Sequence, residues 1–191
     1  MNVPLVVCLT LASVLLIILE RRGLPVVLAL HFKGDIKRES RWFAQYGQAA
    51  CTLVAAGLVW RLDSRILQKT NLPCAMLILV AVFGVSIVST IVKRLLGRVR
   101  PGREDAGKFL GFTWQHANHR ESFPSSHSAC AIALSLVLAR LYPAGAAIFW
   151  TLAILCAALR YLMDAHWPSD VLAGIAVGYA GAALACQWMG V

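Results

Sequence analysis

The sequence predicts an all-α integral-membrane bundle of six transmembrane helices, with a functional site at one membrane face. Three observations lead to this fold class. Hydrophobic residues make up 59% of the 191 residues, the mean hydropathy is +0.70, and most charged residues lie in short segments between apolar runs. This apolar share exceeds that of ordinary soluble domains. The length suits one domain, so we treat residues 1–191 as a single membrane-embedded unit.

Uncharged runs mark the expected helices. Five of them hold 18 or more residues without Lys, Arg, Asp or Glu: 2–19, 42–60, 74–92, 141–159 and 171–191. Crossing the hydrocarbon takes about 17 to 20 apolar residues. A sixth run, 128–141, is shorter and has Arg140 near its end, where the side chain can extend to the interface. A turn at 142–145 then joins the fourth and fifth predicted spans.

The first run also resembles a signal peptide, but it has no basic stretch before it and no clear small-x-small cleavage site. We therefore expect a retained span. Residues 24–32 are apolar but only nine long, which favours a segment in the membrane interface.

Composition narrows the classes of partner. The formal net charge of +9 favours phosphate groups and anionic lipid. Nucleic acid is disfavoured because the basic residues form no continuous polar face. The six cysteines are dispersed, one in each apolar segment, so we expect neither a disulfide framework nor a zinc site, but small buried hydrophobes. The sequence indicates no obligatory protein partner.

The predicted topology brings distant segments together. A polar loop follows the third span near residue 92 and ends near 123, while a second polar segment joins the fifth span to the sixth near 160–168. Because successive spans alternate in direction, the end of the third, the start of the fourth, the end of the fifth and the start of the sixth share one membrane face. Three polar clusters therefore meet there.

The first cluster is KRLLGRVRP, residues 93–101. If the third helix continues beyond the bilayer, Lys93 and Arg100 lie on one face about 10 Å apart along the axis, and a proline then ends the helix. Arg94 and Arg98 form a separate stripe. Basic residues commonly flank spans, so this cluster alone does not establish a site.

The second cluster is FPSSHS, residues 123–128. Ser125 or Ser126 is expected to cap the fourth helix. The N-terminus of that helix offers free backbone N–H groups and a partial positive charge to an anion. His127 lies in its first turn. A cap beside an interfacial histidine is the simpler interpretation of this cluster taken alone.

The third cluster is LRYLMDAHWPSD, residues 159–170. Pro168 suits the first turn of the last helix. Asp170, four residues after His166, can reach the imidazole and fix its tautomer, which leaves the other ring nitrogen free to attack or to ligate. Arg160 can reach the same end of the bundle, and its planar guanidinium is suited to binding phosphate oxygens.

Together the clusters supply two histidines, a carboxylate, a lysine, two arginines, a serine hydroxyl and two helix N-termini. Phosphoryl transfer without a metal needs such a set. Cations and N–H groups bind the phosphate oxygens and stabilise the charge of the transition state. One histidine attacks phosphorus and another protonates the departing oxygen. We therefore expect no metal and no other cofactor.

In order and spacing the clusters resemble the signature of the type 2 phosphatidic acid phosphatase family, which also includes soluble bacterial acid phosphatases and vanadium haloperoxidases. The resemblance is closest to its integral-membrane lipid phosphatases. The matching residues are Lys93, Arg100, Pro101, Pro124, Ser125, Ser126, His127, Arg160, His166 and Asp170. The motifs span residues 93–170, and the six-span layout extends the likeness to nearly the whole chain. It implies metal-independent removal of phosphate from a lipid phosphate or diphosphate.

The resemblance also implies roles. His166 is expected to be the nucleophile that forms a phosphohistidine, with Asp170 orienting it. His127 is expected to be the general acid for the leaving group and then the base that activates water. The phosphate is expected to be held by Lys93, Arg100, Ser125, the Ser126 backbone N–H and Arg160. Ser126 stands where the family often has Gly, and Leu159 where it often has Ser, but neither departure removes a residue with a chemical role.

Other functions remain open at this point. The same site suits a lipid phosphotransferase, in which a lipid hydroxyl replaces water. A transporter or other non-catalytic anion-binding membrane protein is disfavoured, because simple attraction of phosphate needs no nucleophile with an orienting carboxylate. The haloperoxidase relatives are soluble. Undecaprenyl diphosphate, phosphatidylglycerophosphate, phosphatidate and a lipid A phosphate are all suitable substrates.

Three other polar residues are weaker candidates for the functional site. His116 and His119 are a conceivable metal pair, but the sequence places no suitable carboxylate or cysteine with them, so we favour a substrate contact or a plain loop. Asp164 is expected to pair with Arg160 at i, i+4.

Two arguments conflict over orientation. Most proteins that this chain resembles keep the site on the extracytoplasmic face of the cell membrane, which places both termini in the cytoplasm. The segments on the side of the site, however, hold 14 Lys and Arg against four on the opposite side, and the positive-inside rule puts that excess in the cytoplasm. Because some of these cations are there to bind phosphate, we expect the outer face.

Overall fold

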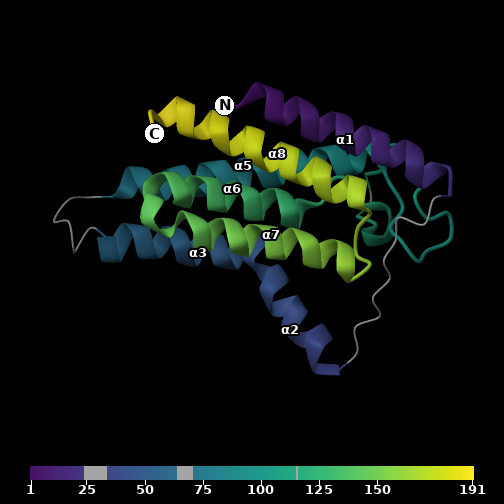
Figure 1. Ribbon diagram of the computed structural model, residues 1–191, viewed down its shortest axis with the longest axis horizontal. Helices are drawn as coiled ribbons and strands as arrows, with labels where there is room; N and C mark the ends of the chain where they lie inside the picture. The colour runs from purple at the N-terminus through teal and green to yellow at the C-terminus, as the bar shows by residue number, and fades with distance from the viewer. Residues whose placement is uncertain (24–33, 64–70, 115) are drawn as a thin grey trace.

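The protein is described here by a computed structural model that covers residues 1–23, 34–63, 71–114 and 116–191. Those residues form helices and loops, and within them the backbone makes no β-strand, although an isolated β-bridge joins Arg98 and Phe109. Most helices run side by side, whereas α2 projects from the bundle (Figure 1). Both termini lie at the end of the bundle opposite the long polar loops.

Four segments are long and apolar enough to cross a membrane. They are α1 (Val3–Arg21), α5 (Leu72–Leu96), Pro143–Leu162, which includes α7 (Ala146–Leu162), and α8 (Pro168–Met189). Two other apolar helices are shorter, α3 (Ala49–Leu58) and α6 (Ser126–Leu141). The predicted all-helical fold is confirmed for the described residues, but the predicted count of six spans is not.

The shortness of α6 follows from its central position. It packs against α5, α7 and α8, and the eleven residues from 128 to 138 are all buried. A helix of 16 residues is only about 24 Å long, less than the roughly 30 Å of a bilayer's hydrocarbon core. Since neighbouring helices surround it, α6 needs neither the length nor the hydropathy of a helix that faces lipid.

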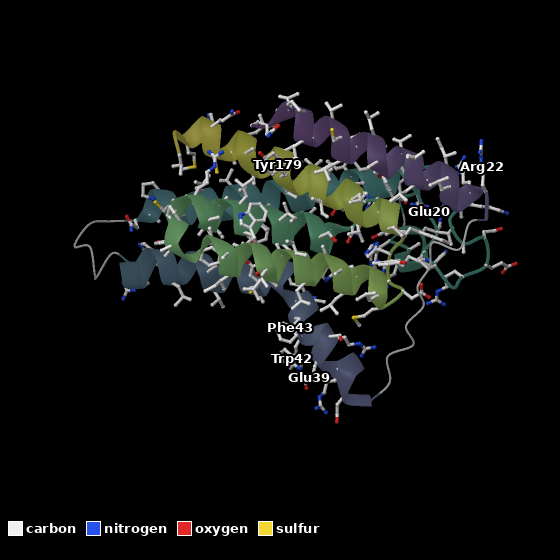
Figure 2. The ribbon with its side chains drawn as sticks, in the orientation of Figure 1. Glu20, Arg22, Glu39, Trp42, Phe43 and Tyr179 are labelled. Carbon is white, nitrogen blue, oxygen red and sulfur yellow. The ribbon has the colours of Figure 1, made fainter. Side chains whose placement is uncertain are left out.

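The predicted span 42–60 is wrong as one continuous helix. The chain there forms α2 (Gly34–Ala44), a 3₁₀ turn η1 (Gln45–Gly47), α3 and a π-helical turn η2 (Val59–Asp63). The break brings Gly47 against α6, where a Cβ atom would lie 2.1 Å from the carbonyl oxygen of His127. Trp42 and Phe43 consequently lie exposed on α2 (Figure 2). The segment 24–32 lies outside the described residues.

The cysteines follow the prediction in part. All six are free, and Cys130, Cys156 and Cys186 are buried among apolar neighbours. Cys8, in contrast, is exposed on α1. Cys51 and Cys74 are partly buried, so the interpretation as buried hydrophobes holds for three of the six cysteines.

Small residues let α8 approach α6 closely. Gly174, Gly178 and Ala182 recur every four residues, a spacing that predicts a close-packing stripe. A Cβ atom on Gly174 would lie 2.5 Å from the carbonyl oxygen of Ser125, and one on Gly178 would lie 2.2 Å from that of Ala129. Ala182 is fully buried. The stripe is thus the contact that fixes the start of α8 beside the start of α6.

We expect Gly178→Val to destabilise the fold by about 3 kcal/mol, because a side chain cannot be fitted against a backbone carbonyl without moving a helix. Gly84→Val is the matched control, since a Cβ atom on Gly84 of α5 meets nothing within 4 Å apart from its own helix. Unfolding in detergent, followed by circular dichroism, should show a lower midpoint for Gly178→Val alone. Equal midpoints for the two variants would contradict the close-packing interpretation.

Candidate active site

The three polar clusters meet at one end of the bundle. The end of α5, the start of α6, the end of α7 and the start of α8 lie together at the end that carries the loops (Figure 1). Backbone bonds tie them directly, because Ser125 N donates to the carbonyl of Asp170 at 2.9 Å and Arg100 N donates to that of His119 at 2.9 Å. The convergence expected from topology is therefore present.

His166 lies in the turn between α7 and α8 and is 1% exposed. Its Nδ1 donates to the carbonyl oxygen of Ser122 at 2.8 Å, which sets the tautomer with the proton on Nδ1. Its Nε2 is buried and has no hydrogen-bond partner among the described residues. Burial lowers the pKa of His166 to about 4, so the ring is neutral at pH 7. Its Nε2 lone pair is thus available for attack.

Asp170 does not make the expected hydrogen bond to the imidazole. Its Oδ2 lies 3.7 Å from His166 Nδ1 and instead accepts from Trp167 N at 3.0 Å and from the hydroxyl of Ser122 at 2.5 Å. Its Oδ1 accepts from Arg98 at 2.5 Å. The reason is local. α8 begins only at Pro168, so His166 precedes the helix while Asp170 caps its first turn. Asp170 therefore acts on the ring through its charge and through hydrogen bonds to Ser122.

The start of α6 matches the prediction that Ser125 or Ser126 caps this helix. Ser125 is the N-cap, and its Oγ accepts from Ser128 N and from Ser128 Oγ at 2.9 Å. Within the described residues its own hydroxyl proton has no acceptor, so it can still donate to a ligand. Ser126 and His127 follow as the first helical residues, whose N–H groups lack intrahelical acceptors.

His127 faces the same cluster. The charges of Arg160, Lys93 and Arg100 act on its ring, and the ring of His166 lies within range of it. Its Nε2 lies 3.3 Å from the side-chain nitrogen of Gln48, at the break between α2 and α3. The two histidines named by the sequence are therefore close enough to interact.

Three cations surround these histidines. Lys93 is buried on α5, and the charges of Arg100 and Arg160 act on it. Burial lowers the pKa of Arg100. The Nε atoms of Arg100 and Arg160 are buried without a hydrogen-bond partner in the part of the chain that the structure describes. Like charges gathered with unsatisfied donors are costly unless an anion binds them, so the arrangement favours a phosphate ligand.

Lys93 and Arg100 do not lie on one continuous helix, contrary to the sequence prediction. α5 ends at Leu96, and Gly97 follows in a left-handed conformation with φ of 58°. The helix therefore does not continue to Arg100, and the prediction that Lys93 and Arg100 share one helix face is wrong. Arg94 and Arg98 also separate, because Arg94 reaches the carbonyl of Trp114 while Arg98 turns into the protein. A glycine at this position is a sequence signal for a helix end.

The sequence model of the PAP2 superfamily matches residues 74–191, more than half of the chain. The chain belongs to this superfamily. All three clusters lie within the matched range.

Individual PAP2 relatives and structures agree with this assignment. Lipid A 1-phosphatases of Rhizobium johnstonii and Rhizobium etli are each 37% identical to the chain over 93 residues. Those residues are 48% of this chain and 38% and 40% of the two relatives, so the match spans well under half of their length. The crystal structure of a transmembrane PAP2-type phosphatidylglycerolphosphate phosphatase from Bacillus subtilis superposes with a TM-score of 0.71 at 17% identity. The superposition covers 96% of this chain and 94% of the Bacillus subtilis chain, and it shows that the two proteins share a fold.

Four residues of this PAP2 site were assigned no role in it by the sequence analysis, although Arg98 was named as part of a separate stripe. They are Gln48 beside His127, Ser122 beside His166, and Arg98 with Glu20 behind Asp170. Glu20 carried a usable signal, since a carboxylate at the C-terminal end of an apolar helix opposes the helix dipole. Ser122 and Gln48 carried none, because their roles depend on loop geometry.

The structure also places the three weaker candidates, His116, His119 and Asp164. His116 Nδ1 lies 2.8 Å from a Glu121 carboxylate oxygen, so a carboxylate is in fact placed beside it. His119 lines a cavity of about 760 Å³ that is also lined by Arg100 and Asp164. Asp164 does not pair with Arg160, because α7 has ended at Leu162 and Asp164 adopts a left-handed conformation with φ of 57°.

Proposed function

We propose that this protein is a multi-pass membrane phosphatase that removes phosphate from a lipid phosphate or diphosphate through a phosphohistidine intermediate. One observation carries the proposal. The buried Nε2 of His166 has no partner among the described residues, and its ring lies within the field of Arg100 and Arg160. A neutral nucleophile beside unsatisfied cationic donors fits attack on a bound phosphate.

The proposed reaction has two steps. In the first, a bond forms between His166 Nε2 and phosphorus while the bond from phosphorus to the lipid oxygen breaks, and His127 gives that oxygen a proton. In the second, His127 takes a proton from water, whose oxygen bonds to phosphorus as the phosphorus–nitrogen bond breaks. Lys93, Arg100, Arg160, Ser125 and the Ser126 N–H hold the phosphate oxygens throughout. No metal takes part.

A lipid substrate is supported by the surroundings of His127. A cavity of about 270 Å³ opens beside this histidine and is lined by Val82, Phe83 and Cys130, among other residues of α3, α5 and α6. This cavity can take the first apolar groups of a leaving lipid while its phosphate meets the cations. Because two relatives are lipid A 1-phosphatases, a lipid A phosphate is the first substrate to test.

We also propose that the site faces away from the cytoplasm. Among the 14 cations on its side, Lys93, Arg98, Arg100 and Arg160 lie within the protein and bind carboxylates or face the phosphate site. Such cations do not act as free loop charges, which weakens the positive-inside argument. In sealed right-side-out vesicles, phosphate should then be released to the outside.

The function is tested with purified protein in detergent, EDTA present, and four lipids: a lipid A phosphate, undecaprenyl diphosphate, phosphatidylglycerophosphate and phosphatidate. We expect inorganic phosphate from at least one of them. A requirement for added divalent metal would contradict the mechanism. Transfer of phosphate to a second lipid without release would identify a phosphotransferase, and binding without turnover would identify an anion-binding protein.

A further inference from the structure

A buried charge cluster lies behind the proposed nucleophile. Arg98 Nη2 lies 2.7 Å from Glu20 Oε2, and Arg98 Nη1 lies 2.5 Å from Asp170 Oδ1. The side chains are 2%, 1% and 0% exposed for Glu20, Arg98 and Asp170. Figure 2 labels Glu20 at the end of α1 nearest the loops. We call these three residues the triad.

The triad is held rigidly. Gly97 turns the chain after α5, and the guanidinium carbon of Arg98 then lies 5.1 Å from the ring centroid of Phe109 and 5.4 Å from that of Trp167. Ser169 completes the contacts, because its hydroxyl accepts from Arg98 at 2.6 Å and lies 2.6 Å from Glu20 Oε2, while its backbone N–H donates to Glu20 Oε1 at 3.1 Å. Each charged group of the triad therefore has a fixed orientation.

The triad is connected to the imidazole through one serine. Asp170 Oδ2 accepts from the hydroxyl of Ser122, and the carbonyl of the same Ser122 accepts from His166 Nδ1. Arg98 therefore fixes Asp170, Asp170 fixes Ser122, and Ser122 fixes the ring whose Nε2 has no partner among the described residues. Glu20, at the far end, is 146 residues away from His166 in sequence.

We propose that Glu20 and Arg98 are positioning residues for His166, an inference that rests on the proposed phosphohistidine mechanism. Two carboxylates and one guanidinium leave the triad with one net negative charge. When Nε2 bonds to phosphorus and Nδ1 keeps its proton, the ring becomes a cation. A fixed negative charge behind it stabilises that cation, and Arg98 keeps Asp170 from moving onto the imidazole.

A purely structural role is the alternative to exclude. The triad joins α1 to α8, and a buried ion cluster can serve only to specify how two helices pack. Ser13 supplies a matched comparison, because its buried hydroxyl donates to the carbonyl of Ser169 at 2.9 Å and so also ties α1 to α8. No hydrogen bond joins Ser13 to Arg98 or to Asp170 in the described structure.

The experiment compares Glu20→Gln with Ser13→Ala. Gln keeps the shape of the side chain and removes its charge. We expect kcat for Glu20→Gln to fall about 10- to 100-fold with KM within twofold, as for residues that orient a reacting group without touching substrate. Ser13→Ala should keep the wild-type kcat. Equal kcat values for wild type, Glu20→Gln and Ser13→Ala would overturn the proposal, and so would equal losses in the two variants.

Arg98→Lys provides a second test if Glu20→Gln does not fold. Lysine keeps the positive charge, but it cannot bind both carboxylates with a planar fork. We expect a loss in kcat with KM little changed, and a wild-type kcat would overturn the proposal. Wild type and His166→Asn are measured in the same series. If wild type releases no phosphate, or His166→Asn still does, the proposed function fails whatever Glu20 and Arg98 do.

Discussion

Replacing His166 with asparagine is expected to reduce phosphate release by roughly 10⁴-fold or more, since the nucleophile itself is removed. Asparagine is a conservative choice here. Its side-chain N–H can still donate to the carbonyl of Ser122, as Nδ1 does at 2.8 Å, so the turn before α8 is preserved. What is lost is Nε2, the buried atom that has no hydrogen-bond partner among the described residues.

Gln187→Asn is the control for this experiment, because that residue is exposed near the far end of α8 and is not among the residues proposed to bind or to react. It should keep full activity. Wild-type protein mixed with labelled substrate and quenched in base should retain phosphate on the chain, whereas His166→Asn should not. Substantial turnover by His166→Asn, or label at another residue, would exclude the proposed nucleophile.

Much of the site could be predicted because topology and local spacing are both encoded in short segments. Uncharged runs predicted that two polar loops share one end of the bundle, and the structure places them there (Figure 1). The capping role of Ser125 and the position of Pro168 at the start of α8 follow from local preferences alone. Close packing at Gly178 follows from a four-residue repeat.

Two predictions about pairs of site residues were wrong for the same physical reason. Both assumed helical spacing between the two residues of a pair, although a helix ends or begins between them. Lys93 and Arg100 are separated by Gly97, and Asp170 is separated from His166 by the start of α8. In each pair one residue lies on a helix, Lys93 on α5 and Asp170 on α8, while Arg100 and His166 lie on loop backbone. Contacts between segments far apart in sequence could not be predicted from local patterns either. One partner of Arg98 is Glu20, 78 residues earlier, and no local pattern links the two.

The predicted span 42–60 failed for a related reason. Hydropathy records that a segment is apolar but not that it must bend around a neighbour. Gly47 packs against the carbonyl of His127, and the bend at that contact also brings Gln48 to the imidazole. A continuous helix there would place both residues elsewhere. The break in the apolar run is therefore part of how the site is built.

We expect Lys93→Met to lower kcat/KM by about 10²- to 10³-fold, which is the usual loss when one charge that stabilises a transition state is removed. Methionine resembles lysine in length and leaves the packing of α5 intact. Lys93 is 8% exposed and lies among the like charges of Arg100 and Arg160. Its removal relieves repulsion and the cost of burying a cation, so the variant should unfold at the same temperature as wild type or above it.

This combination of lower activity with undiminished stability separates a binding role from a structural one. A cation that held the fold together would show the reverse, with a lower unfolding temperature and near-normal kcat/KM. Lys108→Met is the matched control, because that lysine is exposed and pairs with Asp105 in the loop, away from the imidazoles. It should change neither quantity. Since the loss in Lys93→Met is electrostatic, Lys93→Arg should recover part of the activity by restoring the charge, though not the geometry of the ammonium group.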